Sequence, residues 1–136
     1  MSLKNQFTAN RADDSAFCRR FAKQKNGQDF IPWAVQYAAV AQIYDSVEFE
    51  STVDRRDGVT GVEVTARVRL TLGEEVGPWV SATLAVTDRR NKTIPEPQAD
   101  EVQNCRMRAI TKALSIASGR GLSLWFGELQ APGGEG

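Results

Sequence analysis

The residues best suited to chemistry in this chain are cations, and two of them lie one helical turn apart. Arg108 and Lys112 are four positions apart in a segment with helical periodicity, so both side chains should project from one face. Asn104, Thr111 and Ser115 are expected beside them. Cations with hydrogen-bonding neighbours suit contacts with a phosphate backbone, although an ordinary solvated helix face has the same composition.

Further cations form short clusters outside this helix. Arg89, Arg90 and Lys92 belong to a polar loop in which Asp88 is the nearest acid. Arg120 stands between two glycines, where backbone N–H groups can approach an anion. The residues expected to contact phosphate are Arg108, Lys112, Arg120, Arg89, Arg90 and Lys92.

Arg106 falls within the apolar stripe of the same helix, between Val102 and Ala109. An unpaired guanidinium in that place would be costly. We therefore expect Arg106 to form an ion pair, either within the chain or across a subunit boundary.

The sequence argues against an enzyme. It contains no histidine, which removes Ser-His and Cys-His nucleophile pairs and most zinc sites. Glu48, Glu50 and Glu63 could hold Mg²⁺ on a strand face, but solvated carboxylates are the commoner arrangement. No complete phosphate-binding or dinucleotide-binding loop is present. We expect no catalytic residue, no metal and no cofactor.

Composition indicates one modest globular domain. The chain has 136 residues, 41% of them hydrophobic and 25% charged, and its formal net charge is zero. Neutrality weighs against a nucleic-acid binder, yet local clustering can still make a basic stripe. The two distant cysteines, Cys18 and Cys105, and the absence of an apolar membrane-length run or secretory segment lead us to expect a cytoplasmic protein without membrane contact.

Hydrophobic periodicity predicts an α+β fold, an antiparallel three-stranded meander packed against helices, with a short C-terminal strand. We expect a mobile N-terminus at 1–12, one domain at 13–129 and a flexible tail at 130–136. The predicted helices cover 13–25, 32–44 and 100–118. The predicted strands cover 47–53, 61–72, 80–86 and 122–126, with a turn at 56–58.

Several segments together resemble a known family. They read KNG at 25–27, FIPWA at 30–34, NK at 91–92, RAITKA at 108–113 and GRGLSLWFGE at 119–128. In these segments the chain is similar, from about 15 to 129, to the small Sak-type single-strand annealing proteins of bacteriophages. That family is a branch of the superfamily that includes the eukaryotic Rad-type annealing protein. Pro32 replaces a commoner serine, and Gly-Arg-Gly replaces Gly-Leu-Gly, so Arg120 could add a contact.

The resemblance implies a β-β-β-α core, assembly into rings or helical filaments, and annealing of single-stranded DNA without ATP hydrolysis. Single-stranded DNA and further copies of the chain are the implied partners. A host or phage single-strand binding protein or exonuclease is a further candidate. A ring suits a neutral subunit, because repetition turns one small basic patch into a continuous track.

Two alternatives remain open from the sequence. Double-stranded RNA-binding modules also run α-β-β-β-α, but they place lysines where this chain has Asp100 and Glu101. The chain could instead be a structural oligomer whose cations only keep it soluble.

Overall fold

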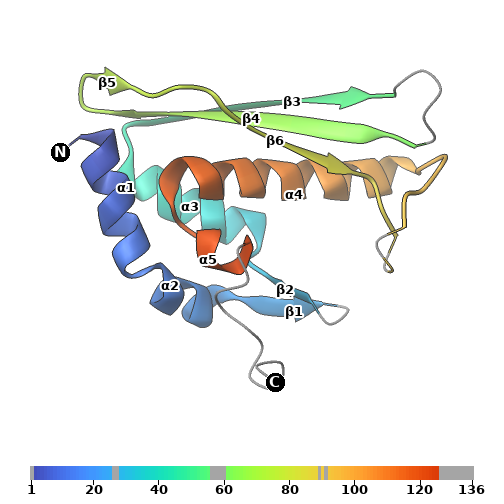
Figure 1. The fold of residues 1–136 in the computed structure, drawn as a ribbon, viewed down its shortest axis with the longest axis horizontal. Helices are drawn as coiled ribbons and strands as arrows, with labels where there is room; N and C mark the ends of the chain where they lie inside the picture. Colours follow the sequence, from blue (N-terminus) through green and yellow to red (C-terminus); the bar gives the residue numbers. More distant parts are fainter. Residues whose placement is uncertain (1, 26–27, 56–60, 89, 91, 126–136) are drawn as a thin grey trace.

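The central strand of the fold is β4 (Glu63–Leu72), seen in a computed structural model that describes residues 2–25, 28–55, 61–88, 90 and 92–125 (Figure 1). It pairs antiparallel with β3 (Ser46–Asp54) on one side and with β6 (Val80–Ala85) on the other. The two-residue strand β5 (Glu75–Val76) pairs with the end of β4. The predicted α+β class is therefore confirmed, with a four-stranded antiparallel sheet.

Strands β5 and β6 lie along successive parts of the same side of β4. Val76 pairs with Thr71, whereas Val80 pairs with Val68. Between them, Gly77 donates its N–H to the carbonyl oxygen of Leu70 at 2.8 Å. Pro78 has no N–H to continue the ladder, which accounts for the break before β6.

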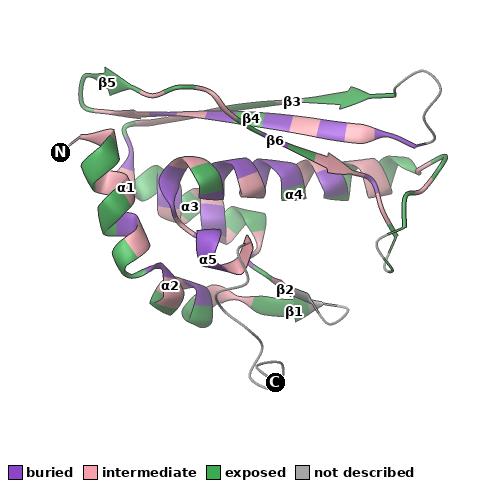
Figure 2. Ribbon diagram, viewed as in Figure 1, coloured by how far each residue is buried: buried purple, intermediate pink, exposed green. Residues whose placement is uncertain are grey.

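The helices lie on one face of this sheet, and the described residues place none on the other face (Figure 1). The apolar residues of β4 alternate toward the helices because successive side chains of a strand point to opposite faces. They meet α3 (Trp33–Ile43) and α4 (Ala99–Ser118), as Figure 2 shows by their burial. The core comprises Val40, Tyr44, Val62, Val64, Ala66, Val68, Leu70, Ala82, Val86, Cys105, Ala109, Ile110, Ala113 and Leu114.

Helix α4 is buried on two sides. Its N-terminus has a capping box, in which Glu101 accepts the Gln98 N–H at 2.7 Å, and it ends at Gly119 with φ of 84°. Thr111 and Ser115, expected beside the exposed cations, are buried because further helices cover that side. Ile116, expected in the apolar stripe, is 38% exposed.

The N-terminal segment differs from the mobile stretch expected at 1–12. Residues Leu3–Ala12 form α1, capped by the Ser2 side chain, which accepts the Asn5 N–H. The side chain of Asn10 is buried. The segment has few apolar residues, so its sequence conceals a helix that is anchored by polar contacts.

The helix expected at 13–25 is shorter in the structure. Helix α2 covers Asp14–Phe21, and the chain then forms a small hairpin of β1 (Lys23–Lys25) and β2 (Gln28–Phe30). By contrast, the helix expected at 32–44 is confirmed as α3 to within one residue at each end.

The predicted strand at 122–126 is wrong over its described part. Leu122–Trp125 forms the short helix α5. Gly121 has φ of 80°, which turns the chain, and its carbonyl oxygen accepts the Leu124 N–H at 3.2 Å. A four-residue alternation cannot distinguish such a turn from a strand.

Several predictions fall outside the described residues. These are the turn at 56–58, the side chain of Arg89 and the tail at 130–136. Within the described part, no helix has the length and apolar character needed to cross a membrane.

Candidate nucleic-acid interface

The exposed side of α4 presents the two cations singled out from the sequence. Arg108 is exposed, and Lys112 is half-buried with its Nζ 5.4 Å from the ring centroid of Trp125. They lie one turn apart on the side of the helix that neither the sheet nor the other helices cover. The two cations therefore form a strip, called here the α4 strip.

The charge of Arg108 is felt inside the protein. Burial raises the pKa of the Cys105 thiol, while the positive charge of Arg108 acts in the opposite direction. Arg108 makes no ion pair with any of the described acidic residues, so its charge is directed to solvent.

Most other described arginines are neutralised within the chain. Their ion pairs are Arg11–Asp14, Arg55–Glu96, Arg67–Glu50, Arg69–Glu48 and Arg120–Asp13. The fold thus divides the cations of a neutral chain into paired and available sets. The α4 strip belongs to the available set, together with Arg90 and Lys92.

The outer face of the sheet shows this pairing most clearly. Arg69 donates two hydrogen bonds to Glu48, each 2.9 Å, and Arg67 pairs with Glu50. The hydrogen bonds from Arg69 lower the pKa of Glu48. Both guanidiniums also lie over Trp79, at 4.3 and 4.7 Å from its ring.

The same pairs bear on the magnesium alternative. Glu48 and Glu50 were candidate ligands, but each carboxylate is occupied by an arginine on the neighbouring strand. Among the described residues, no group of three or more histidine, cysteine, aspartate or glutamate side chains could hold a metal ion.

The loop before α4 holds Arg90 and Lys92 in solvent. Asp88 accepts the backbone N–H of Arg90 at 2.8 Å and that of Lys92 at 3.0 Å. These two backbone hydrogen bonds lower the pKa of Asp88. The carboxylate thus shapes a tight turn whose exposed side chains are cations.

Arg120 is placed differently from the α4 strip. Its guanidinium pairs with Asp13 at 2.6 Å, lies 5.1 Å from the ring of Phe17, and its side chain is only 15% exposed. It lines a shallow depression with Asp13, Phe17 and Arg20. The fold therefore assigns Arg120 an internal partner, which its sequence context between two glycines did not reveal.

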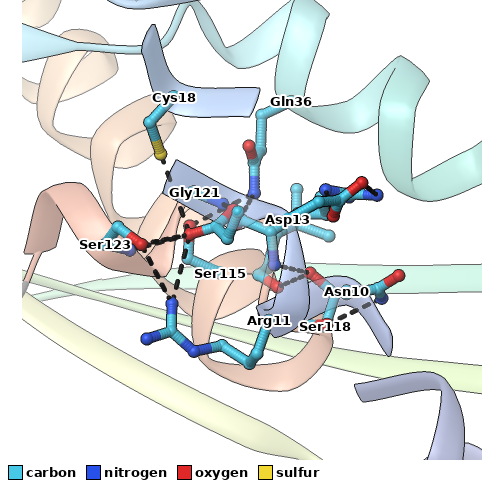
Figure 3. A network of polar contacts seen from close by, with 12 residues as sticks. Asn10, Arg11, Asp13, Cys18, Gln36, Ser115, Ser118, Gly121 and Ser123 are labelled. Carbon is cyan, nitrogen blue, oxygen red and sulfur yellow. Dashed lines mark hydrogen bonds and ion pairs between the residues drawn. The ribbon is translucent and has the colours of Figure 1, made fainter. Parts of the chain in front are cut away.

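The anion position expected beside Arg120 is filled by Asp14 of the chain itself (Figure 3). This carboxylate is fully buried and accepts the N–H groups of Gly121 at 2.6 Å and Ser123 at 2.9 Å. The Ser123 hydroxyl donates at 2.8 Å, and Arg11 pairs with it at 3.2 Å. Backbone N–H groups after Gly119 do bind an anion, but that anion is internal.

A second set of buried polar contacts joins α1, α3 and α4 (Figure 3). Asn10 donates to the carbonyl oxygen of Ser118 at 2.8 Å and to the Tyr44 hydroxyl at 3.1 Å. Gln36 donates to Ser115 Oγ at 3.2 Å and to the carbonyl oxygen of Arg120. Sequence reasoning missed this network, since its signal is isolated polar residues on apolar faces.

Arg106 does not take the acidic partner expected for it in the described part of the chain. Its guanidinium donates to Gln103 Oε1 at 3.2 Å. The Nε atom of Arg106 is buried and has no hydrogen-bond partner among the described residues. The side chain is half-buried, so its charged end can still reach water.

The candidate residues thus occupy three places along α4. Arg90 and Lys92 precede its N-terminus, Arg108 and Lys112 lie along its exposed side, and Arg120 follows its C-terminus. Arg89 lies outside the described residues. Comparisons of the chain with protein-family models, curated proteins and solved structures find no match.

Proposed function

We propose that this chain binds and anneals single-stranded DNA, independently of ATP, as a ring or filament in phage-type homologous recombination. The observation that carries the proposal is the α4 strip, two cations left without acidic partners on a helix that is otherwise largely buried. The order β3, β4, β6, α4 supports it, since the resemblance to Sak-type annealing proteins implies a β-β-β-α core.

Arg108 and Lys112 would contact successive phosphates, and Arg90 and Lys92 would extend the track beyond the N-terminus of α4. Arg89 is assigned to the same end from its sequence position. Arg120 has a smaller share, because Asp13 already neutralises its guanidinium. Contacts made to the backbone by cations are independent of base sequence, so the bases stay free to pair.

The neutrality of the chain fits this function through its assembly. The acids that pair with Arg67, Arg69 and Arg120 lie away from the α4 strip, so they do not cancel its field. Repeating the strip around a ring gives a long basic path from a subunit with no net charge.

The test compares a double variant, Arg108→Ala with Lys112→Ala, with a control of equal charge loss, Arg19→Ala with Lys23→Ala. Binding to labelled oligo-dT is measured over a range of salt concentrations. We expect the strip variant to lose about tenfold or more in affinity, and its log-log salt slope to fall by about 0.7 for each lost phosphate contact. The control should keep most of both quantities.

Three further results would decide against the proposal. Unchanged affinity and salt slope in the folded strip variant would remove the site. A preference for duplex RNA over oligo-dT in competition would favour an RNA-binding module. Failure of the wild type to bind any oligonucleotide at low salt would favour a structural oligomer. Annealing of two complementary oligonucleotides without ATP is the corresponding activity assay.

A further inference from the structure

An exposed aromatic strip runs from α3 to β3. Phe49 of β3 is 44% exposed and its ring lies 5.9 Å from that of Tyr37. Tyr37 in turn lies 6.2 Å from Trp33, which is 43% exposed. Val53, further along β3, is 44% exposed. An exposed apolar surface of this kind beside a sheet edge marks a contact surface.

The strip borders an open edge of the sheet. Strand β3 pairs with β4 on one side, and no described residue pairs with its other side. Strand β6 is likewise paired with β4 and open on its far side within the described chain. Both edges leave backbone N–H and C=O groups free to pair with another strand.

The β6 edge also has apolar residues beneath it. Cys105 of α4 contacts the carbonyl oxygens of Leu84 and Ala85 at 3.6 Å, so this side of α4 faces β6. Ile116 follows Cys105 by 11 residues and, at about 100° per residue, lies on the same side. It is 38% exposed, and Leu84 is half-buried.

We propose that the β3 edge and its aromatic strip bind the β6 edge of a second copy of this chain. Such a contact would continue the sheet from one copy into the next. Beneath it, Phe49 and Trp33 of one copy would pack near Leu84 and Ile116 of the other. It would therefore bury the exposed apolar groups of both edges together.

Charge decides between this contact and the pairing of two β3 edges. On the outer face β3 carries Glu48, Glu50 and Asp54, so two β3 strands side by side would oppose like charges. The outer residues of β6 include Ser81 and Thr83, which have no charge. The acidic edge of one copy therefore suits the neutral edge of another.

The two strands would pair in parallel. Both β3 and β6 run antiparallel to β4, so they run in the same direction within each copy. A contact between two different edges is heterologous and repeats into a ring or an open filament. The inference rests on the proposed function only for the expectation that copies assemble, and it names the surfaces that do so.

Cysteine cross-linking tests the contact directly. Thr52→Cys places a thiol on the exposed face of β3, and Ser81→Cys places one on that of β6. Both native cysteines are buried, so they give little background with a flexible bis-maleimide. The variant with both new cysteines should give a ladder of multimers. Mixing the two single variants should give cross-linked dimers but no longer species.

Three outcomes overturn the inference. Dimers from Thr52→Cys by itself would show that two β3 edges meet, and absence of any cross-link in the double variant would show that these edges do not meet. In sedimentation, Phe49→Glu should reduce assemblies to single chains, whereas Val76→Glu, at a 59% exposed position outside the strip, should not. Equal behaviour of these two variants would also overturn it.

Binding to oligo-dT is measured on the same samples. Assembly through these edges without DNA binding would keep this inference and remove the proposed function. DNA binding by a protein that assembles through other surfaces would do the reverse.

Discussion

The carboxylate of Asp14 accepts the backbone N–H of Gly121 at 2.6 Å, although the two residues are 107 positions apart in the chain. This hydrogen bond connects the start of α2 to the turn that leads into α5. It places an acid of the chain where the Gly-Arg-Gly sequence suggested an external anion. The N-terminal helices are therefore part of the domain's polar core.

We predict that Asp14→Asn destabilises the protein by about 3 kcal/mol, since it removes a buried charge that is paired with Arg11 and turns an amide donor toward two backbone donors. Urea unfolding measures the change. Asp13→Asn is the matched control: its side chain is 63% exposed, so about 1 kcal/mol or less should be lost. Equal losses in both variants would contradict this role of Asp14.

Gly121→Ala should cost more stability than Gly73→Ala. Both glycines have positive φ, 80° and 62°, so both variants strain the backbone by about 1 kcal/mol. At Gly121 the new Cβ would also lie 2.9 Å from Gln36 Oε1 and 3.0 Å from Ser115 Oγ, whereas at Gly73 nothing lies within 4 Å. Thermal unfolding of the two variants should show the difference, and a smaller loss at Gly121 would refute it.

Asp13→Asn should raise the affinity for oligo-dT by roughly two- to fivefold at low salt, because it releases the guanidinium of Arg120 near the end of α4. Glu74→Gln, which also removes one negative charge from an exposed position, is the control for net charge. The gain should disappear when Arg120→Ala is added to Asp13→Asn. A gain of equal size in Glu74→Gln would mean that net charge, and not Arg120, is responsible.

The Cys18 thiol should stay protonated and slow to alkylate at pH 8 in the folded protein. Burial, together with the negative charge of Asp14, raises its pKa to about 12 from an ordinary 9.0. Between these values the unfolded state loses a proton that the folded state keeps. Stability should therefore fall as pH rises above about 9, by at most about 1.4 kcal/mol per pH unit from this group.

Urea unfolding from pH 8 to 10 measures this dependence, with Cys18→Ala as the comparison. The variant should show a flatter pH dependence, although the raised pKa of Cys105 leaves part of it. Rapid alkylation of Cys18 at pH 8 without denaturant would refute the assigned pKa.

The sheet and the long helices could be predicted because their signals are local. Val64, Val68 and Leu70 alternate with polar residues on β4, and all three are buried as expected. Gly119 ends α4 in the left-handed region, which glycine adopts without a steric penalty. The exposure of Arg108 also follows from its place on the helix opposite Ala109 and Ala113.

The polar core could not be predicted, since it depends on residues that are distant in the chain. Thr111 and Ser115 look like surface residues until α1 and α3 cover that side of α4. Helix α1 has little apolar content, and the hydrogen bonds of Asn10 to Tyr44 and Ser118 cross 34 and 108 positions. A strand-like alternation at 122–125 likewise gave way to α5 beneath Asp14.

By itself, the sequence determined the strands, the long helices and the presence of cations on α4, because periodicity and backbone preference act over a few neighbouring residues. The tertiary structure decided which of those cations remain available. Arg67, Arg69 and Arg120 look as accessible in the sequence as Arg108 and Lys112, yet each of the three has an acidic partner elsewhere in the chain. Ion pairing depends on distance in space, which strand register and helix packing set.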